Sequence, residues 1–357
     1  MGQSTLPVSD RRRFLATAAA SLATARCGLL ETLAAPFQSL AEFSALAAGA
    51  NWLNSPRLTP SDLIGKVVLV NFWTYTCINW MRTLPSLRAW QQRYRRGFVV
   101  VGVHTPEFGF EHDVENVRRA VTQMSIEYPV VTDNDYRIWR AFGNNAWPSL
   151  FFVDARGKVR ERHNGEGRYA ESEATIQRLL AEIGIRGIEQ RPVEAVGTGA
   201  EAPADWRNLQ TPETYVGYER MERFASPGGA ALNRQHAYTF PASLGFNQWA
   251  LSGEWSVGAQ ATGLRNAGGR IAFRFHGRDL HLVMGPGKLS GPVRFRVSLD
   301  GRPPGLAAGG DVDATGVGSV VEPRVYQLIR QPKPIDDRRF EIEFLDLGVE
   351  AFSFTFG

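Results

Sequence analysis

The most constraining stretch of the chain runs from Val67 to Pro85 and reads VVLVNFWTYTCINWMRTLP. Its first part is an apolar, largely β-branched run without alternation, which is typical of a strand buried on both faces of a sheet. After Cys77, apolar residues return at three-residue steps, which indicates an amphipathic helix. These residues are Ile78, Met81, Leu84 and Leu87. The stretch therefore predicts a buried strand, a short turn and a helix that begins at Cys77.

The predicted place of Cys77 at a helix start has a chemical consequence. The first N–H groups of a helix are unpaired, and the helix dipole favours a negative charge at that end. A thiol in this position is expected to have a lowered pKa and to form the reactive thiolate more readily. Cys77 is therefore the candidate nucleophile.

The elements that follow predict an α/β domain with parallel strands. Strand, helix and strand succeed one another at the spacing of parallel crossover units. We expect strands at 98–103, 128–131 and 149–154, helices at 114–124, 135–142 and 174–183, and a hairpin turn at 154–157 that leads into 158–163.

The stretch FWTYTCINWMRTLP resembles the active-site stretch of exported thioredoxin-like proteins of the TlpA/ResA type. It is closest to the thioredoxin domain of DipZ-like cytochrome c biogenesis proteins, and the resemblance extends over about residues 51–185. The family carries Cys-x-x-Cys, whereas this chain reads Cys77-Ile78-Asn79-Trp80, so Trp80 stands at the position of the second, resolving cysteine. The resemblance implies a thioredoxin-like fold and thiol–disulfide exchange with protein thiols or a small thiol.

The same resemblance implies a set of substrate-contacting residues around Cys77. Pro148 precedes the apolar strand 149–154, and in this fold that position holds a cis-proline loop beside the cysteine. Trp73, Trp147 and Pro148 are then candidates to contact a partner, with the backbone of Trp147 free to pair with an extended segment. His104 and Glu107, at the end of the next strand, are further candidates for substrate binding. The alternative for these last two residues is a polar loop without a catalytic role.

Residues 187–215 read as a linker, because proline, glycine and mixed charges occur there without a sustained period. Beyond it, apolar residues alternate in short segments separated by turns, as in an antiparallel sandwich or jelly roll. The aligned apolar sets are 271/273/275, 280/282/284, 293/295/297/299, 340/342/344 and 352/354/356. This part resembles the β domain that follows thioredoxin in DipZ-like proteins, at Trp249–Trp255 and Phe340–Phe344. That resemblance implies a carbohydrate-binding domain and a possible glycan ligand.

The first 47 residues read as an export leader. Arg11–Arg13 followed by Phe14-Leu15 and an alanine-rich run resembles the twin-arginine motif, and Arg26 interrupts the run, which argues against a permanent membrane span. Small-residue cleavage sites occur at 23–25 and at 45–47, and the sequence does not choose between them. We therefore expect an exported protein, periplasmic or extracytoplasmic, with a leader (1–47), a thioredoxin-like domain (48–186), a linker (187–215) and a β-sandwich domain (216–357).

Composition excludes some classes of function. The formal net charge is +4, but the arginines are scattered rather than gathered on one stretch, so no nucleic-acid partner is predicted. The chain has only two cysteines, Cys27 in the predicted leader and Cys77, so it has no disulfide framework. No metal site and no cofactor are predicted.

Three functions remain open at this level. The first is a single-cysteine thiol–disulfide oxidoreductase, because Trp80 cannot resolve a mixed disulfide and neither Asn71 nor Thr83 can carry a proton. The second is a one-cysteine peroxidase, because Thr74 and Cys77 form the Thr-x-x-Cys pattern of peroxiredoxins. The third is a redox-inactive binding protein that retains the thioredoxin fold as a platform.

Overall fold

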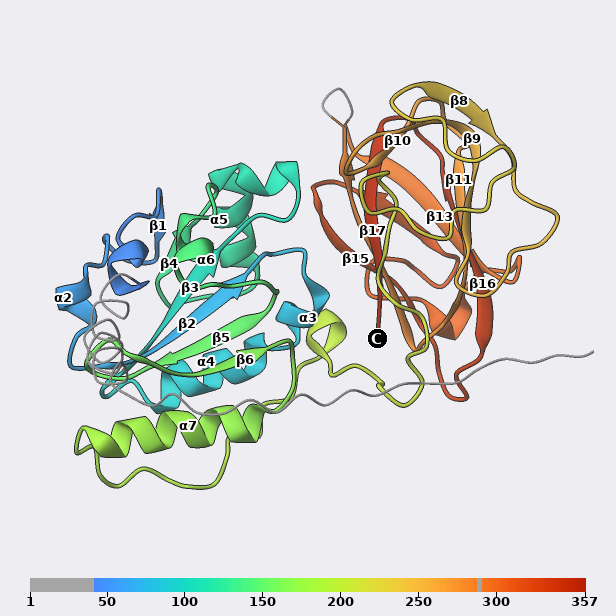
Figure 1. Cartoon of the computed structure of the whole chain (residues 1–357). Helices are drawn as coiled ribbons and strands as arrows, with labels where there is room; N and C mark the ends of the chain where they lie inside the picture. The colour runs from blue at the N-terminus through green and yellow to red at the C-terminus, as the bar shows by residue number, and fades with distance from the viewer. Residues whose placement is uncertain (1–41, 288–290) are drawn as a thin grey trace, which may run out of the picture. The chain divides into compact units, whose positions relative to one another are not determined.

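The computed structural model describes residues 42–287 and 291–357. The twin-arginine stretch Arg11–Arg13, the cleavage site at 23–25 and Cys27 lie outside the described residues. Figure 1 shows an α/β region, coloured blue to green, and an all-β region, coloured orange to red. The chain therefore has the thioredoxin-like region followed by the all-β region that the sequence predicts.

The α/β region is built on a six-stranded sheet in which β2, β3 and β4 are parallel and the outer strands are antiparallel. β2 lies in the interior of this sheet, between β3 and β5, as Figure 1 shows. In spatial order the strands are β1 (Trp52–Leu53), β4 (Val130–Thr132), β3 (Phe98–His104), β2 (Val67–Trp73), β5 (Ser149–Val153) and β6 (Val159–Asn164).

Helices bury both faces of this sheet. α4 (Leu84–Arg93), α5 (Val114–Gln123) and α7 (Tyr169–Glu182) contribute to one apolar cluster, and α2 (Pro60–Leu63) and α6 (Arg137–Ala141) contribute to the other. Along β2, Val67, Leu69 and Trp73 belong to the first cluster, and Val68, Val70 and Phe72 to the second. The prediction of a strand buried on both faces is confirmed, because every residue of β2 is buried.

The helix after Cys77 differs from the prediction. It is divided into α3 (Ile78–Met81) and α4, with Arg82 and Thr83 between them. Pro85 explains the break. Its nitrogen carries no hydrogen to donate, and its ring clashes with the backbone carbonyl one turn earlier in the helix. α7 begins at Tyr169, five residues before the predicted start at position 174, since its first turn is mostly polar and shows no apolar period.

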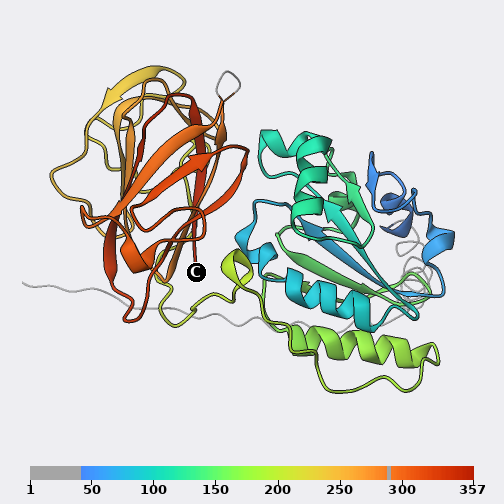
Figure 2. The same ribbon diagram turned by 180° about the vertical axis from the view of Figure 1, so that it is seen from behind.

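The all-β region forms one antiparallel sheet of eleven described strands that curls so that its two halves enclose a single core. β9 carries the chain from one half to the other: Trp249–Ser252 pairs with β11 and Trp255–Val257 pairs with β10. Gly253, between these segments, has φ +97°, which favours glycine. Figure 2 shows this curled sheet from behind.

The strands along this sheet are β14 (Val317–Val320), β13 (Val293–Leu299), β16 (Asp337–Phe344), β11 (Arg270–His276), β9 (Trp249–Val257), β10 (Thr262–Leu264), β17 (Val349–Phe356), β12 (Asp279–Pro286) and β15 (Arg324–Arg330), with β7 (Thr214–Tyr215) on β17 and β8 (Gln235–Tyr238) on β9.

One prediction in this region is corrected, and one strand was not predicted. Phe352 does not share a face with Phe354 and Phe356, because the pairing of β12 with β17 shifts register there and turns Phe352 outward, against Phe108 and Phe110. β15 was not predicted from the sequence. Its middle residues are all buried, so its sequence lacks the alternation of apolar and polar residues by which half-buried strands are recognised.

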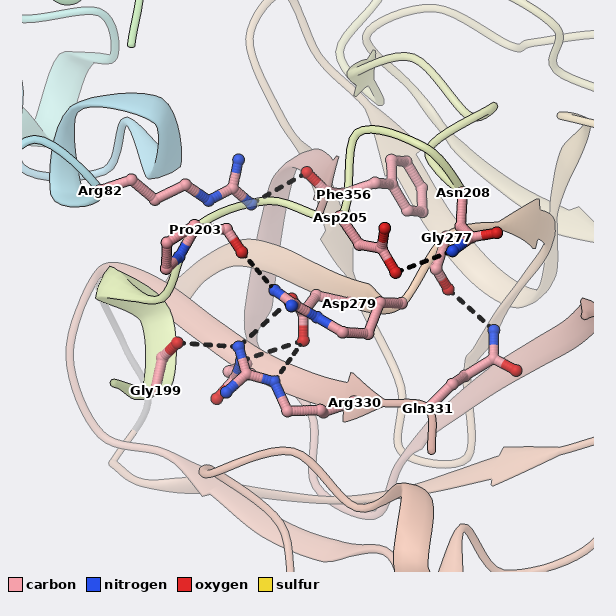
Figure 3. Close-up of polar contacts among 12 residues, drawn as sticks. Arg82, Gly199, Pro203, Asp205, Asn208, Gly277, Asp279, Arg330, Gln331 and Phe356 are labelled. Carbon is pink, nitrogen blue, oxygen red and sulfur yellow. Dashed lines mark hydrogen bonds and ion pairs between the residues drawn. The ribbon is translucent and has the colours of Figure 1, made fainter. Parts of the chain in front are cut away.

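A buried carboxylate fastens the linker to the β region. Asp279 accepts hydrogen bonds from Arg330 Nε (2.7 Å) and Arg278 Nη2 (2.7 Å). The same arginines donate to linker carbonyls, Arg330 to Gly199 O (2.9 Å) and Arg278 to Pro203 O (2.7 Å), as Figure 3 shows. Burial alone would raise the pKa of Asp279, but the hydrogen bonds from Arg330 and Arg278 hold it below its usual range.

We expect Asp279→Asn to lower the free energy of unfolding by about 3 kcal/mol, because one partner of a buried ion-pair network is removed. The difference from the native protein should be present near neutral pH and should be lost as acid protonates Asp279, since a lowered carboxyl pKa stabilises the fold only above it. Urea unfolding at several pH values measures this effect. Limited proteolysis should also cut the variant faster within 199–208.

Asp337→Asn is the matched control, because Asp337 forms an ion pair with Arg274 and its side chain is 46% exposed. Its effect on unfolding should stay below about 1 kcal/mol. Equal losses in the two variants would show that Asp279 has no special structural role.

Candidate functional site

Cys77 lies where the sequence places it, between β2 and the first turn of α3. It is the residue immediately before that helix, with φ −78° and ψ 107°. Its Sγ is 3.8 Å from the carbonyl oxygen of Trp147, and the peptide bond between Trp147 and Pro148 is cis, as predicted. The structure therefore brings the cysteine and the proline loop together, although 70 positions separate Cys77 from Trp147 in the sequence.

The surroundings of Cys77 disfavour its thiolate. Burial raises the pKa of the thiol well above its ordinary value, and the negative charges of Glu213 and Glu107 raise it further. The backbone N–H groups of Trp80 and Asn79 act in the opposite direction and are outweighed. The expectation that the helix start lowers this pKa is therefore wrong, because desolvation and carboxylates exceed the effect of the helix end.

Trp80 fills the position one helical turn beyond the thiol. Its side chain is fully buried and stacks on Trp73, with ring centroids 4.2 Å apart. Cys77 is the free cysteine among the described residues, and the residue that faces it from the next turn is an indole. Because Trp73 is itself fully buried, it contributes to the core under the site and presents no surface to a partner. Trp147 is only half-buried, so its predicted contact with a partner remains open.

Among the described residues that pack beneath the thiol, none can carry its proton. His104 is fully buried, and desolvation, followed by the charge of His112, lowers its pKa to about 3, so the ring stays neutral at physiological pH. It stacks on Tyr75 with centroids 5.6 Å apart. Asn71 and Thr74 are also fully buried, Asn71 beside the Tyr128 hydroxyl and Thr74 beside the Glu111 carboxylate. His104 and Thr74 are thus packed inside, without a surface for substrate or peroxide.

Glu111 is a site residue that sequence reasoning missed. Its carboxylate accepts hydrogen bonds from Thr76 Oγ1 (2.7 Å), Glu107 N (2.6 Å) and Phe108 N (2.9 Å). It therefore joins the turn that precedes Cys77 to the loop that follows β3. Burial raises the pKa of Glu111 to about 7 against the opposing effect of these bonds. The sequence signal was weak, because an acidic residue in a loop is ordinarily solvated.

Glu107 receives its partners from the C-terminal region. Tyr215 OH and Arg220 Nη1 each donate to its Oε1 at 2.7 Å, and the Arg220 guanidinium lies 3.6 Å from the centre of the Tyr215 ring. Tyr215 and Arg220 were not predicted, because more than 100 residues separate them from Glu107 and no motif marks them. The predicted candidate Glu107 is thus near the thiol, within a network that spans both regions.

The described residues hold no group of three His, Cys, Asp or Glu side chains placed to bind a metal ion. Within 42–287 and 291–357, no helix has the length and apolar character needed to cross a membrane. The chemical groups of the site among the described residues are one thiol, the cis-proline loop and the carboxylates Glu107, Glu111 and Glu213.

Two family models match this chain. Residues 43–162 match the AhpC/TSA family, and residues 211–357 match the family described as thioredoxin like C-terminal domain. The first match contains Cys77, Glu107 and Pro148, and the second contains Tyr215 and Arg220. The two models thus meet at the network around Glu107.

Known proteins are similar to one or both regions of this chain. Protein DipZ of Mycobacterium tuberculosis is 32% identical over 332 residues, which are 91% of this chain but only 44% of DipZ, so the chain spans less than half of that relative. Thiol-disulfide oxidoreductase YkuV of Bacillus subtilis is 28% identical over 37% of this chain and 88% of its own length.

A solved structure is similar to the α/β region. The putative thiol:disulfide interchange protein DsbE of Chlorobium tepidum is 30% identical, covers 35% of this chain and 84% of its own, and gives a TM-score of 0.31. The chain therefore consists of a thioredoxin-like region of the AhpC/TSA family followed by a thioredoxin like C-terminal domain, and its similarity to DipZ extends over both.

Proposed function

We propose that this protein is an exported thiol–disulfide oxidoreductase that works with one cysteine. The observation that carries the proposal is the position of Cys77, whose Sγ lies 3.8 Å from Trp147 O, beside the cis-proline loop. An extended partner segment that pairs with the backbone at Trp147, ahead of Pro148, would then lie next to the one described thiol. The similarity to thiol-disulfide oxidoreductase YkuV supports the same class of chemistry.

The reaction has two exchange steps. The Cys77 thiolate attacks one sulfur of a partner's disulfide, a mixed disulfide forms, and the other sulfur leaves as a thiolate that takes up a proton from water. A second, external thiolate then attacks the partner's sulfur in the mixed disulfide, forms a disulfide with the partner and releases Cys77 as a thiolate. The external thiol is required because Trp80 supplies no sulfur for internal resolution. The partner is therefore a protein or small-molecule disulfide, and the releasing agent is a thiol from outside the described residues.

The pH dependence of the first step tests this proposal. Because the pKa of Cys77 is raised, the thiolate fraction should increase about tenfold for each pH unit from 6 to 9 without reaching a plateau. The rate of mixed-disulfide formation with glutathione disulfide, followed by mass spectrometry of the intact protein, should rise with the same slope. A plateau below pH 7 would contradict the raised pKa.

Glu107→Gln should increase the rate of this step at pH 7 by at least about threefold, because it removes a negative charge that disfavours the Cys77 thiolate. Glu127→Gln is the control, since Glu127 is an exposed carboxylate that lies outside the network around Glu107. If both variants react at the rate of the native protein, the charge of Glu107 does not govern the thiol.

A second candidate function is favoured by the raised pKa itself. A thiol that stays protonated at neutral pH suits a redox-inactive thioredoxin-fold protein, whose β region binds a glycan or protein partner. Failure of Cys77 to react at any pH up to 9, with full biological activity of Cys77→Ser, would establish this function in place of the first. A sulfenic acid trapped by dimedone after peroxide would instead identify a one-cysteine peroxidase, the activity that the AhpC/TSA match also allows.

We also propose export by the twin-arginine route. The side chains that pack into the α/β core indicate where the leader is cleaved. Phe43 and Leu46 are each 1% exposed and belong to the apolar cluster on one face of the thioredoxin-like sheet. A leader removed after position 47 would take both side chains out of this cluster, whereas cleavage near 23–25 would leave them in place.

We therefore expect the exported protein to begin upstream of Phe43. N-terminal sequencing of protein recovered from the periplasm or culture medium tests this, with Arg12→Lys and Arg13→Lys together as the variant that should block export. A mature protein that begins at position 48 would contradict the expectation.

A further inference from the structure

Two cavities beside the thiol share one wall. The smaller has a volume of about 230 Å³, and the larger has a volume of about 740 Å³. Both are lined by Glu219, Ala259 and Gln260, so they are adjacent, and together they are called here the thiol groove. At one end it is lined by Glu107, Trp147, Tyr215 and Arg220, and at the other by Phe110, Pro286, Glu350 and Phe352.

The thiol groove starts at the reactive end of the site. Trp147 lines its smaller cavity, and the carbonyl of the same residue contacts Cys77 Sγ. The backbone N–H of Trp147 donates no hydrogen bond to any described residue, so it can pair with the backbone of an extended segment. Gly109, Gly258 and Gly285 also line the larger cavity, and their lack of side chains allows a second backbone to approach closely.

Most charged side chains that line the thiol groove are negative. Its charged residues are three carboxylates, on Glu107, Glu219 and Glu350, and one guanidinium, on Arg220. Arg220 is already paired with Glu107 at 2.7 Å. Glu219 and Glu350 are exposed and form no ion pair within the described residues. Among the described residues, the lining of the groove therefore carries more negative than positive charge, although the chain as a whole has a formal net charge of +4.

We propose that the thiol groove binds an extended protein segment in which the exchanging cysteine is flanked by lysine or arginine. The assignment of the groove to an exchanging cysteine rests on the proposed function. Phe110, Pro286 and Phe352 offer apolar contacts for the side-chain stems, and Glu219 and Glu350 face the charged ends. A basic flank near Glu107 also offsets a negative charge that disfavours the Cys77 thiolate, so the preferred partner promotes its own exchange.

The first experiment measures exchange with short peptides of three kinds. Each has one central cysteine held as a mixed disulfide with 5-thio-2-nitrobenzoate, and its flanking residues are basic, neutral or acidic. Attack by Cys77 forms the peptide–Cys77 disulfide and releases the coloured thiolate, so each rate is read directly. The full-length protein should react with the basic peptide roughly tenfold faster than with the acidic one at low salt, and this ratio should fall towards one at about 0.5 M salt.

Substitutions separate the groove from general surface charge. Glu219→Gln with Glu350→Gln should reduce the basic-to-acidic ratio by about five- to tenfold, since two exposed carboxylates are lost. Glu127→Gln removes an exposed carboxylate outside the groove and should leave the ratio unchanged. An unchanged ratio in the double variant would overturn the proposal. A change of the same size in Glu127→Gln would do so as well.

The second experiment measures binding without exchange. The same peptides, with serine in place of cysteine and a fluorescent label, are titrated against Cys77→Ser protein by fluorescence anisotropy. Tighter binding of the basic peptide, together with no exchange in the first experiment, would retain the groove and remove the proposed function. Exchange with all three peptides at equal rates, together with equal binding, would retain the proposed function and overturn the preference for a basic segment.

Discussion

The position of the thiol depends on a buried carboxylate that has no cation beside it among the described residues. Glu111 accepts hydrogen bonds from Thr76, Glu107 and Phe108, and it thereby fixes the turn before Cys77 against the loop after β3. Burying a carboxylate is unfavourable unless hydrogen bonds replace its lost hydration, and here backbone and hydroxyl donors do so. With a pKa of about 7, Glu111 changes its charge near neutrality, within one residue of the cysteine turn. The geometry that brings Cys77 towards Glu107 is therefore built on this group.

Among the described residues, aromatic side chains rather than a general acid or base pack beneath Cys77. Trp73 and Trp80 stack on one another, and His104 lies edge-on to Trp73 with centroids 5.0 Å apart. The same desolvation that keeps His104 neutral also raises the pKa of Cys77. A group that could take the thiol proton is therefore absent from the described residues under the helix, and desolvation, followed by the charges of Glu213 and Glu107, disfavours the thiolate.

The C-terminal region takes part in the site as well as in the fold. Tyr215 and Arg220 hold Glu107, and Phe352 packs against Phe108 on the same loop. On the helix side, Arg82 is buried, pairs with Glu166 at 2.9 Å and donates to the Phe356 carbonyl at 3.1 Å, as Figure 3 shows for the latter. These contacts connect the loop and the helix on either side of Cys77 to β17 and to the segment before it.

The sequence by itself determined the local elements of the site. The unalternated apolar run of β2, the return of apolar residues after Cys77 and the proline ahead of β5 are short-range patterns. The strand and the proline are found at their predicted places, and the helix begins where it was predicted but is divided into α3 and α4. The fold class followed from the order of such elements. Prediction from the sequence failed where the local pattern is irregular. At Phe352 a bulge interrupts the alternation, and in β15 the middle residues are all buried, so the faces of these residues were not predictable.

Only the tertiary structure decided the chemistry of the thiol. A helix start is visible in the sequence, and by itself it favours a thiolate. Burial and the carboxylates of Glu107 and Glu213 outweigh it, and they reach Cys77 from positions 30 or more residues away. Desolvation and charge act through space, so their sum depends on which distant segments fold against the cysteine. The sequence determined that one thiol stands at a helix start beside a proline loop, and the assembled structure decided that burial and nearby carboxylates raise the pKa of this thiol.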